Sequence, residues 1–277
     1  METDNGHERP LTVALCEMLG TALFVYGIMI NGADNAGVAC SLFASVLIFG
    51  GVTGGHFNPA VTLGVYFAEA DFFGNLIFML GIIISQCAGG MLAIGMAYLS
   101  LFDQSTMKET EKWTPVICPK PLLPGDKPVE CDGKDGNFNL NLNTLINEIV
   151  CTFIFISVIL MIKGKHTAPT TDGIAGAVGV VATLMGMIKT GMRLGACFNP
   201  AVGLTLILNQ FLWLENTNGY LTHYWYAYIG GPAVAGVLAG IFHLMHAKAF
   251  EKEEDKTHQN IRGFTDEKKG LMVNDYD

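Results

Sequence analysis

Two copies of one short motif carry most of the functional chemistry in this sequence. The letters FNPAV occur twice, 141 positions apart. Each copy holds an Asn-Pro pair, Asn58-Pro59 and Asn199-Pro200, which favours the start of a helix, because Asn caps the first turn and Pro needs no hydrogen bond there. A helix N-terminus carries about half a positive charge. The chemistry predicted here is noncovalent: amide donors and a positive potential presented to a passing molecule.

The surroundings of both motifs are apolar. The chain has 277 residues, of which 51% are hydrophobic and only 15% are charged, a composition typical of a multi-pass membrane protein. A bilayer core of about 30 Å needs about 20 apolar residues per helix. Six runs are long candidates, although the fifth is shorter than the others: 11–30, 38–55, 72–102, 142–162, 173–188 and 220–245. Two shorter runs, 58–68 and 199–214, predict half-spans that begin at the Asn-Pro pairs.

The two halves of the chain repeat each other. Glu17 and Glu148 open the first and fourth spans and are each followed by Thr at the fourth and Phe at the seventh position, with an offset of 131. Each half contains three full spans, an odd number, so the second half must lie inverted relative to the first. We therefore expect the half-spans to enter from opposite faces and to meet near the membrane midplane, as in other inverted repeats.

The motifs and their flanks resemble the aquaporin, or major intrinsic protein, family over about residues 11–245. The matching stretches are GGHFNPAVTLG, GACFNPAVG, the two Glu-x-x-x-Thr openings, SQCAGG at 85–90 and YIGGP at 228–232. The resemblance implies an all-α membrane protein with six transmembrane helices and two half-helices. It also implies one pore in each subunit of a homotetramer. In that pore Asn58 and Asn199, with Pro59, Ala60, Pro200 and Ala201 completing the motifs, would face the permeating molecule.

Three titratable residues are assigned to the loops that carry the motifs. Ionisable groups inside spans are functional by default, but the resemblance favours a scaffold role for Glu17 and Glu148, in which each carboxylate accepts hydrogen bonds from loop backbone. His56 precedes the first motif Asn by two residues. It either lines the pore mouth or caps loop backbone, and the sequence leaves both open.

The sequence departs from the family at the narrowest part of the pore. Most members have Arg three residues after the second Asn, where this chain has Val202. The spacing of the family places Val38, Met187 and Ala196 in the same constriction, which predicts an apolar ring without a charge. Arg193 either takes over the missing charge or lies in the outer vestibule, and the second interpretation is favoured.

Several further expectations concern packing and the connecting segments. Cys118 and Cys131 share the 103–141 loop and either form a disulfide, if that loop is extracytoplasmic, or remain free. Close helix packing is expected at six glycines, Gly20, Gly89, Gly90, Gly95, Gly230 and Gly236. The domain plan is an N-terminal segment 1–10, a channel domain 11–246 with repeats at 11–102 and 142–246, and a mobile, charged tail 247–277. Lysines in loops favour cytoplasmic termini.

Together these features predict a passive channel for water and small uncharged solutes such as glycerol. The sequence contains no nucleotide-binding loop, zinc-protease motif, catalytic-triad spacing or cofactor motif, so no enzyme, cofactor, metal or nucleic-acid partner is expected. Two alternatives remain: a pore for another neutral solute such as urea or ammonia with poor water flow, and a membrane junction protein with little transport. The preferred solute is not determined by the sequence.

Overall fold

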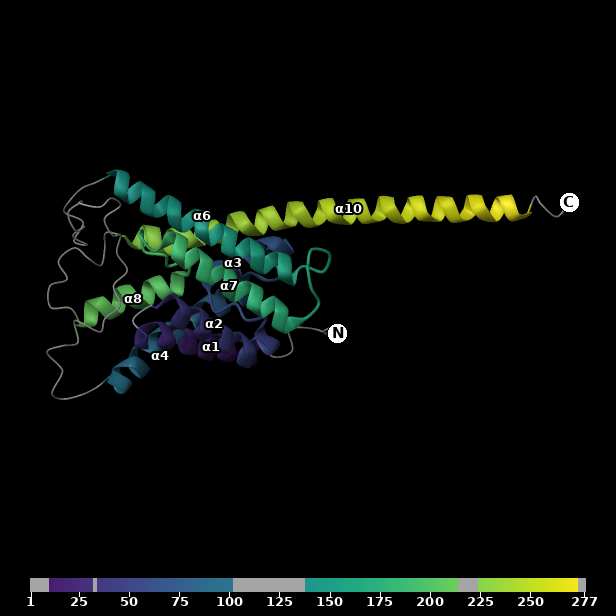
Figure 1. Ribbon diagram of the computed structural model, residues 1–277. Helices are drawn as coiled ribbons and strands as arrows, with labels where there is room; N and C mark the ends of the chain where they lie inside the picture. The colour runs from purple at the N-terminus through teal and green to yellow at the C-terminus, as the bar shows by residue number, and fades with distance from the viewer. Residues whose placement is uncertain (1–9, 32–33, 102–137, 214–223, 274–277) are drawn as a thin grey trace.

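The computed structural model describes residues 10–31, 34–101, 138–213 and 224–273 (Figure 1). Within these residues every regular element is helical and no strand occurs. The expected all-α fold is therefore confirmed. Six helices in the described residues are long and apolar enough to cross a membrane, which makes the chain a multi-pass integral membrane protein.

The long helices follow the expected spans closely. Large apolar side chains remain exposed on them, for example Ile77 at 84% and Ile84 at 69%, because lipid rather than water covers these faces. The helices are α1 (Pro10–Ile30), α2 (Asn35–Thr53), α4 (Leu76–Leu101), α6 (Phe138–Lys163), α7 (Gly173–Gly191) and α10 (Gly231–Val273), the last preceded by a π-helical turn η2 (Tyr226–Gly230).

Two shorter helices begin at the repeated motifs. They are α3 (Pro59–Glu69) and α8 (Pro200–Trp213), of 11 and 14 residues. At 1.5 Å per residue each covers about 16–21 Å, well short of a ~30 Å hydrocarbon core. Pro stands at the first position of both helices and Asn at the preceding cap, so the sequence signal for a helix start operates twice.

Each half-helix packs against the last full span of the other repeat. The half-helix α3 lies against α10, and α8 lies against α4. Glycine makes both contacts close: a Cβ on Gly236 of α10 would lie 2.2 Å from the Ala60 carbonyl oxygen, and one on Gly90 of α4 would lie 2.0 Å from Thr205 Oγ1. The repeats thus exchange half-helices, which ties the two halves of the bundle together.

The face of the bundle at which α1 begins and at which α2 and α6 end is called the terminal face below. By alternation along the chain, α10 also leaves at this face, and Figure 1 shows it extending far beyond the bundle. The sequence analysis expected a mobile tail from residue 247. The structure instead continues one helix to Val273, since the segment AFEKEEDKTHQ contains good helix formers and neither Gly nor Pro.

Other expectations need correction or fall outside the described residues. A Cβ on Gly95 or Gly230 would meet nothing within 4 Å, so these two glycines do not mediate close packing, unlike Gly20, Gly89, Gly90 and Gly236. Cys118 and Cys131 lie outside the residues that the structure describes, and their pairing stays a prediction. The fifth span extends three residues further than expected, to Gly191.

Replacing Gly236 with Ala tests the exchanged packing. The new Cβ would collide with backbone of α3, which cannot move aside as a flexible side chain would. Overpacking of this kind costs about 1–3 kcal/mol, so Gly236→Ala is expected to lower the thermal stability of the purified protein.

The matched control is Gly95→Ala, at an open position of α4 where Ala favours the helix. It is expected to leave the thermal stability unchanged or to raise it slightly. Equal melting temperatures for Gly236→Ala and Gly95→Ala would contradict the close contact between α3 and α10.

Candidate functional site

The two motif loops meet and exchange hydrogen bonds. The Asn58 side chain donates through Nδ2 to the Phe198 carbonyl oxygen at 2.9 Å, and Asn199 Nδ2 donates to the Phe57 carbonyl oxygen, also at 2.9 Å. Both Asn side chains are buried, with 5% and 3% exposed. The structure therefore brings together two residues that are 141 positions apart in the chain, in a reciprocal arrangement that repeats the symmetry of the sequence.

The other end of each Asn amide starts its half-helix. Asn58 Oδ1 accepts from the Ala60 backbone N–H at 2.8 Å, and Asn199 Oδ1 accepts from the Ala201 N–H at 2.9 Å. Each amide thus uses its oxygen for a helix cap and one of its two N–H groups for the opposite loop. One N–H group per Asn remains for a further acceptor.

Two fully buried carboxylates hold the loops from behind. Glu17 accepts from the backbone N–H groups of His56 and Phe57 at 3.0 and 2.8 Å. Glu148 does the same in the second repeat, accepting from Cys197 and Phe198 at 2.9 Å each. Both carboxylates are 0% exposed. Because unpaired backbone N–H groups in a membrane cost several kcal/mol, these four bonds make the irregular loops tolerable.

The first loop has an additional polar network that the sequence analysis did not predict. Gln86 of α4 donates through Nε2 to Glu17 at 2.8 Å and to the Thr62 hydroxyl at 2.9 Å. Thr62 Oγ1 also lies 3.2 Å from His56 Nδ1. His56 is therefore held against the first turn of α3. Gln86 belongs to the SQCAGG stretch, and an uncharged amide inside a 31-residue run without charge was the available signal.

The residue before each Asn has an unusual backbone conformation. Phe57 has φ 45° and Phe198 has φ 56°, in the left-handed region that non-glycine residues rarely adopt. Both rings are almost completely buried, at 0% and 1% exposed. Strain of this kind persists only where the surroundings impose it. It is offset here by the Glu bonds to the same residues' N–H groups and by the burial of the rings.

Two adjoining cavities lead from the terminal face to the Asn pair. An entry cavity of about 250 Å³ lies between loop residues 54–55, α2, α6 and α7. A central cavity of about 30 Å³ is lined by both Asn side chains and by apolar side chains of α1, α2, α6 and α7. They share four wall residues, Val46, Gly55, Ile159 and Val180. The central cavity has room for a water-sized molecule.

The four residues assigned to the constriction come from four different segments. Val38 lies in α2 and Val202 in α8, and both are buried, at 7% and 4% exposed. Met187 of α7 and Ala196 in the loop before α8 are partly buried and pack against the same core cluster. Ala196 also has a left-handed backbone, with φ 54°. No charged side chain belongs to this set, and Arg193 is exposed, between α7 and the second motif.

The segment leading to Asn199 is fixed by two residues that the sequence analysis did not assign to the site. Tyr228 of η2 is 1% exposed, and its hydroxyl donates to the Leu194 carbonyl oxygen at 3.0 Å. Gly195, with φ 115°, passes so close to the Tyr228 ring that any side chain would collide with it. Cys197 is buried, its thiol contacts the Asn199 carbonyl oxygen at 3.2 Å, and the residue also contributes to the wall of the central cavity.

Comparison with known proteins agrees with this geometry. The family model for the major intrinsic protein matches residues 8–243. The chain belongs to the major intrinsic protein family. Members of this family are channels for water and small solutes rather than enzymes.

Individual relatives cover most of this family member. It is 27% identical over 252 residues to Aquaporin Z of Photorhabdus laumondii, covering 84% of this chain and 96% of that protein. A probable TIP-type aquaporin of Medicago truncatula is 24% identical, with 85% and 86% covered. Among solved structures, the aquaglyceroporin of Plasmodium falciparum has a TM-score of 0.67 at 16% identity, covering 84% of this chain, which supports the fold.

The carboxylate at Glu148 offers a direct test of the loop support. Glu148→Gln keeps the size but replaces one acceptor oxygen by an NH₂ group, which faces a backbone N–H that then has no acceptor. A buried donor without a partner costs about 1–3 kcal/mol. We expect lower thermal stability and lower solute flux than in the wild-type protein reconstituted at equal density.

Glu251→Gln, an exposed site on α10, makes the same chemical change away from the loops and should match the wild type in both measurements. If Glu148→Gln also matched the wild type, the carboxylate would not be needed to hold the second loop.

Proposed function

We propose that this family member is a passive channel for water and small uncharged solutes of about the size of glycerol. The observation that carries the proposal is Val202, which stands where the family pattern implies an Arg in the narrowest part of the pore. With Val38, Met187 and Ala196 around it, a permeating molecule meets apolar side chains and backbone carbonyls. A larger neutral solute is then not held back by a bulky hydrated guanidinium group.

The Asn pair supplies the polar contact in this proposal. Each Asn retains one N–H group for an acceptor in the central cavity, so a solute hydroxyl or a water oxygen can exchange its hydrogen bonds at this point. The rest of that cavity wall is largely apolar, which keeps binding weak enough for release.

Exclusion of cations is assigned to the half-helices rather than to an arginine. Two N-termini of about +0.5 each meet at the Asn pair. At an effective dielectric constant near 20, two unit charges about 4 Å apart repel by roughly 4 kcal/mol. A barrier of this size slows a cation by about a thousandfold, so the loss of the family's arginine need not make the pore conduct ions.

The proposed orientation places the terminal face in the cytoplasm. Lys163 ends α6 and Lys165 follows it, and Lys248 and Lys252 lie on α10 as it leaves the same face. Positive charge close to the ends of spans favours the cytoplasmic side. By resemblance to the family, we propose a homotetramer with a separate pore in each subunit.

Osmotic swelling of proteoliposomes tests the proposed function directly. Vesicles containing the purified protein are exposed either to an osmotic gradient that drives water flow alone or to a gradient of glycerol, urea or ammonia. We expect fast water flow and fast glycerol flow, both well above protein-free vesicles. Fast flow of urea or ammonia with slow water flow would favour the first alternative. Flow no greater than in empty vesicles would favour a junction protein.

Val202→Arg tests the role of the constriction. A hydrated guanidinium at this position is expected to lower glycerol flux by about tenfold or more, which corresponds to ~1.4 kcal/mol of added barrier, and to lower water flux much less. The quantity to measure is the ratio of glycerol to water permeability in vesicles of equal protein content.

The companion variant is Arg193→Ala. If Arg193 supplied the charge at the constriction, its removal would change the ratio, whereas Val202→Arg would leave it unaltered. That pattern would refute the assignment of selectivity to position 202.

A further inference from the structure

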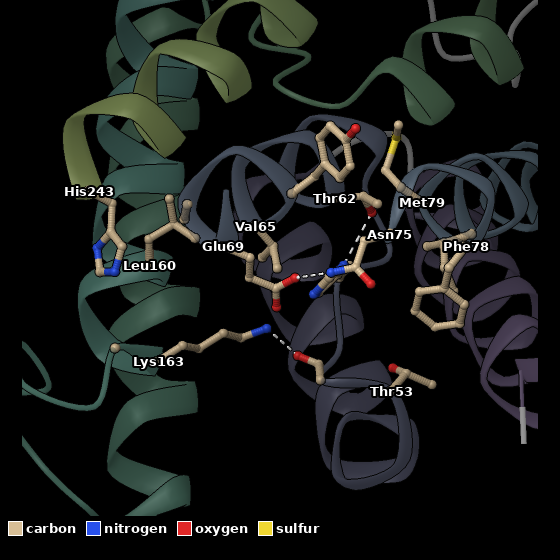
Figure 2. Close-up of a pocket in the computed structure, with 16 residues that line it drawn as sticks. Thr53, Thr62, Val65, Glu69, Asn75, Phe78, Met79, Leu160, Lys163 and His243 are labelled. Carbon is tan, nitrogen blue, oxygen red and sulfur yellow. Dashed lines mark hydrogen bonds between the residues drawn. The ribbon is translucent and has the colours of Figure 1, made fainter. Parts of the chain in front are cut away.

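A third cavity, larger than the two described above, lies beside the pore rather than along it. It has a volume of about 730 Å³ and opens between the ends of α2 and α6, the half-helix α3, the first turns of α4 and His243 of α10 (Figure 2). We call it the side pocket. Its size falls within the range of about 300–1,000 Å³ that is usual for sites that bind small molecules.

Loop residues 54–56 and Lys163 separate the side pocket from the pore. His56 lines both the side pocket and the central cavity. Gly54 and Lys163 line both the side pocket and the entry cavity. The remaining wall residues of the side pocket line neither pore cavity. The two spaces therefore have a common wall, and that wall is the loop which carries Asn58.

Lys163 presents a positive charge to the side pocket. Its Nζ donates to the Gly54 carbonyl oxygen, which uses one of the three N–H groups of an ammonium. The side chain is exposed, and Figure 2 shows it reaching across the pocket from the α6 wall. His56 Nε2 lies close by, since a Cβ added to Gly54 would be 3.6 Å from both nitrogens. Two polar nitrogens thus flank one point of the wall.

The side of the pocket that faces Lys163 is apolar. Met79 and Ile82 of α4 are buried there, at 7% and 4% exposed, and Phe78 extends the same surface. Leu160 of α6 and Val65 of α3 add apolar side chains to the other walls. Figure 2 shows Phe78 and Met79 on the wall that faces Lys163. A ligand that fits both walls has an anionic end and an apolar body.

A carboxylate near the pocket limits the charge of such a ligand. Glu69 accepts from Asn75 Nδ2 at 3.1 Å, and both residues line the pocket. A dianion such as a phosphate ester would be repelled by Glu69 more strongly than a monoanion. His243 adds an unsatisfied group to the wall: it is 9% exposed and its Nδ1 has no hydrogen-bond partner. The best match is a monocarboxylate.

We propose that the side pocket binds a small amphipathic monocarboxylate, with the carboxylate at Lys163 and the apolar body along α3 and α4. A carboxylate is a stronger acceptor for an ammonium than a neutral carbonyl is, so the ligand draws Lys163 away from Gly54. The loop then loses an attachment beside the pore entry, and flux falls. This last step rests on the proposed function, whereas binding does not.

Calorimetric titration of the full chain in nanodiscs tests the binding. The probe is benzoate, which stays in solution, against wild type, Lys163→Gln and Lys165→Gln. Lys165 lies at the same face, is exposed and does not line the pocket, so it is the matched control. We expect affinity to fall at least tenfold in Lys163→Gln and to change less than twofold in Lys165→Gln. Phenyl phosphate should bind more weakly than benzoate.

A second variant controls for the possibility that Lys163→Gln weakens binding by disturbing the loop at Gly54 rather than by removing a contact with the ligand. Ala68→Phe fills the pocket without changing any charge and should also weaken benzoate binding at least tenfold, while the protein still elutes as a folded species. No benzoate binding to the folded wild type would overturn the proposal. Equal binding by wild type and both pocket variants would overturn it as well.

Competition identifies the source of the ligand. If oleate mixed into the nanodisc lipid displaces benzoate, the natural ligand is a fatty acid from the bilayer. If it does not, the ligand is a soluble carboxylate.

Vesicle swelling with and without benzoate then tests the coupling between the side pocket and the pore: we expect the flux to be at least twofold lower with benzoate than without it. Binding without any change in flux would reject the coupling and retain the site.

Discussion

The structure depends on satisfying the backbone of two irregular loops inside a membrane. Outside the pore cavity no water is available there to bond free N–H and C=O groups. Glu17 and Glu148 provide acceptors for the N–H groups that precede each motif. Asn58 and Asn199 provide donors for the carbonyls of the opposite loop. The unusual backbone of the two Phe residues is held by the same partners, which bond both their N–H groups and their carbonyl oxygens.

The same bonds define where the cavities from the terminal face end. Because the loops stop at the middle of the bundle, two half-helix N-termini face each other, and the cavity between the Asn pair has a volume of only about 30 Å³. The glycines of α4 and α10 bring the half-helices close enough for this meeting. Packing between repeats and polar contacts within the loops therefore fix one geometry together, and neither would position the Asn pair alone.

Much of the fold could be inferred from the sequence, because spans and helix starts depend on local signals. The charge-free runs predicted the long helices, the repeated Asn-Pro pairs predicted the half-helices, and the odd number of full spans in each half predicted the inverted relation. Side-chain partners were harder to infer. Gln86 contacts Glu17 across 69 positions and Lys163 contacts Gly54 across 109, and no local pattern encodes such pairs. The continuous helix to Val273 was missed because a charged composition was interpreted as a mobile tail.

The reciprocal bonds between the two motif loops can form only late in the synthesis of this protein. Asn58 emerges from the ribosome 141 residues before Asn199, and chains grow at about 5–20 residues per second. For roughly 7–30 seconds the first loop lacks both partners from the second loop. The Asn58 amide has no Phe198 carbonyl to donate to, and the Phe57 carbonyl has no Asn199 amide to accept from. The first half of the channel is thus synthesised before its hydrogen-bond partners exist. Until the second half is made, the lipid headgroups, water or the insertion machinery must bond the polar groups of its loop.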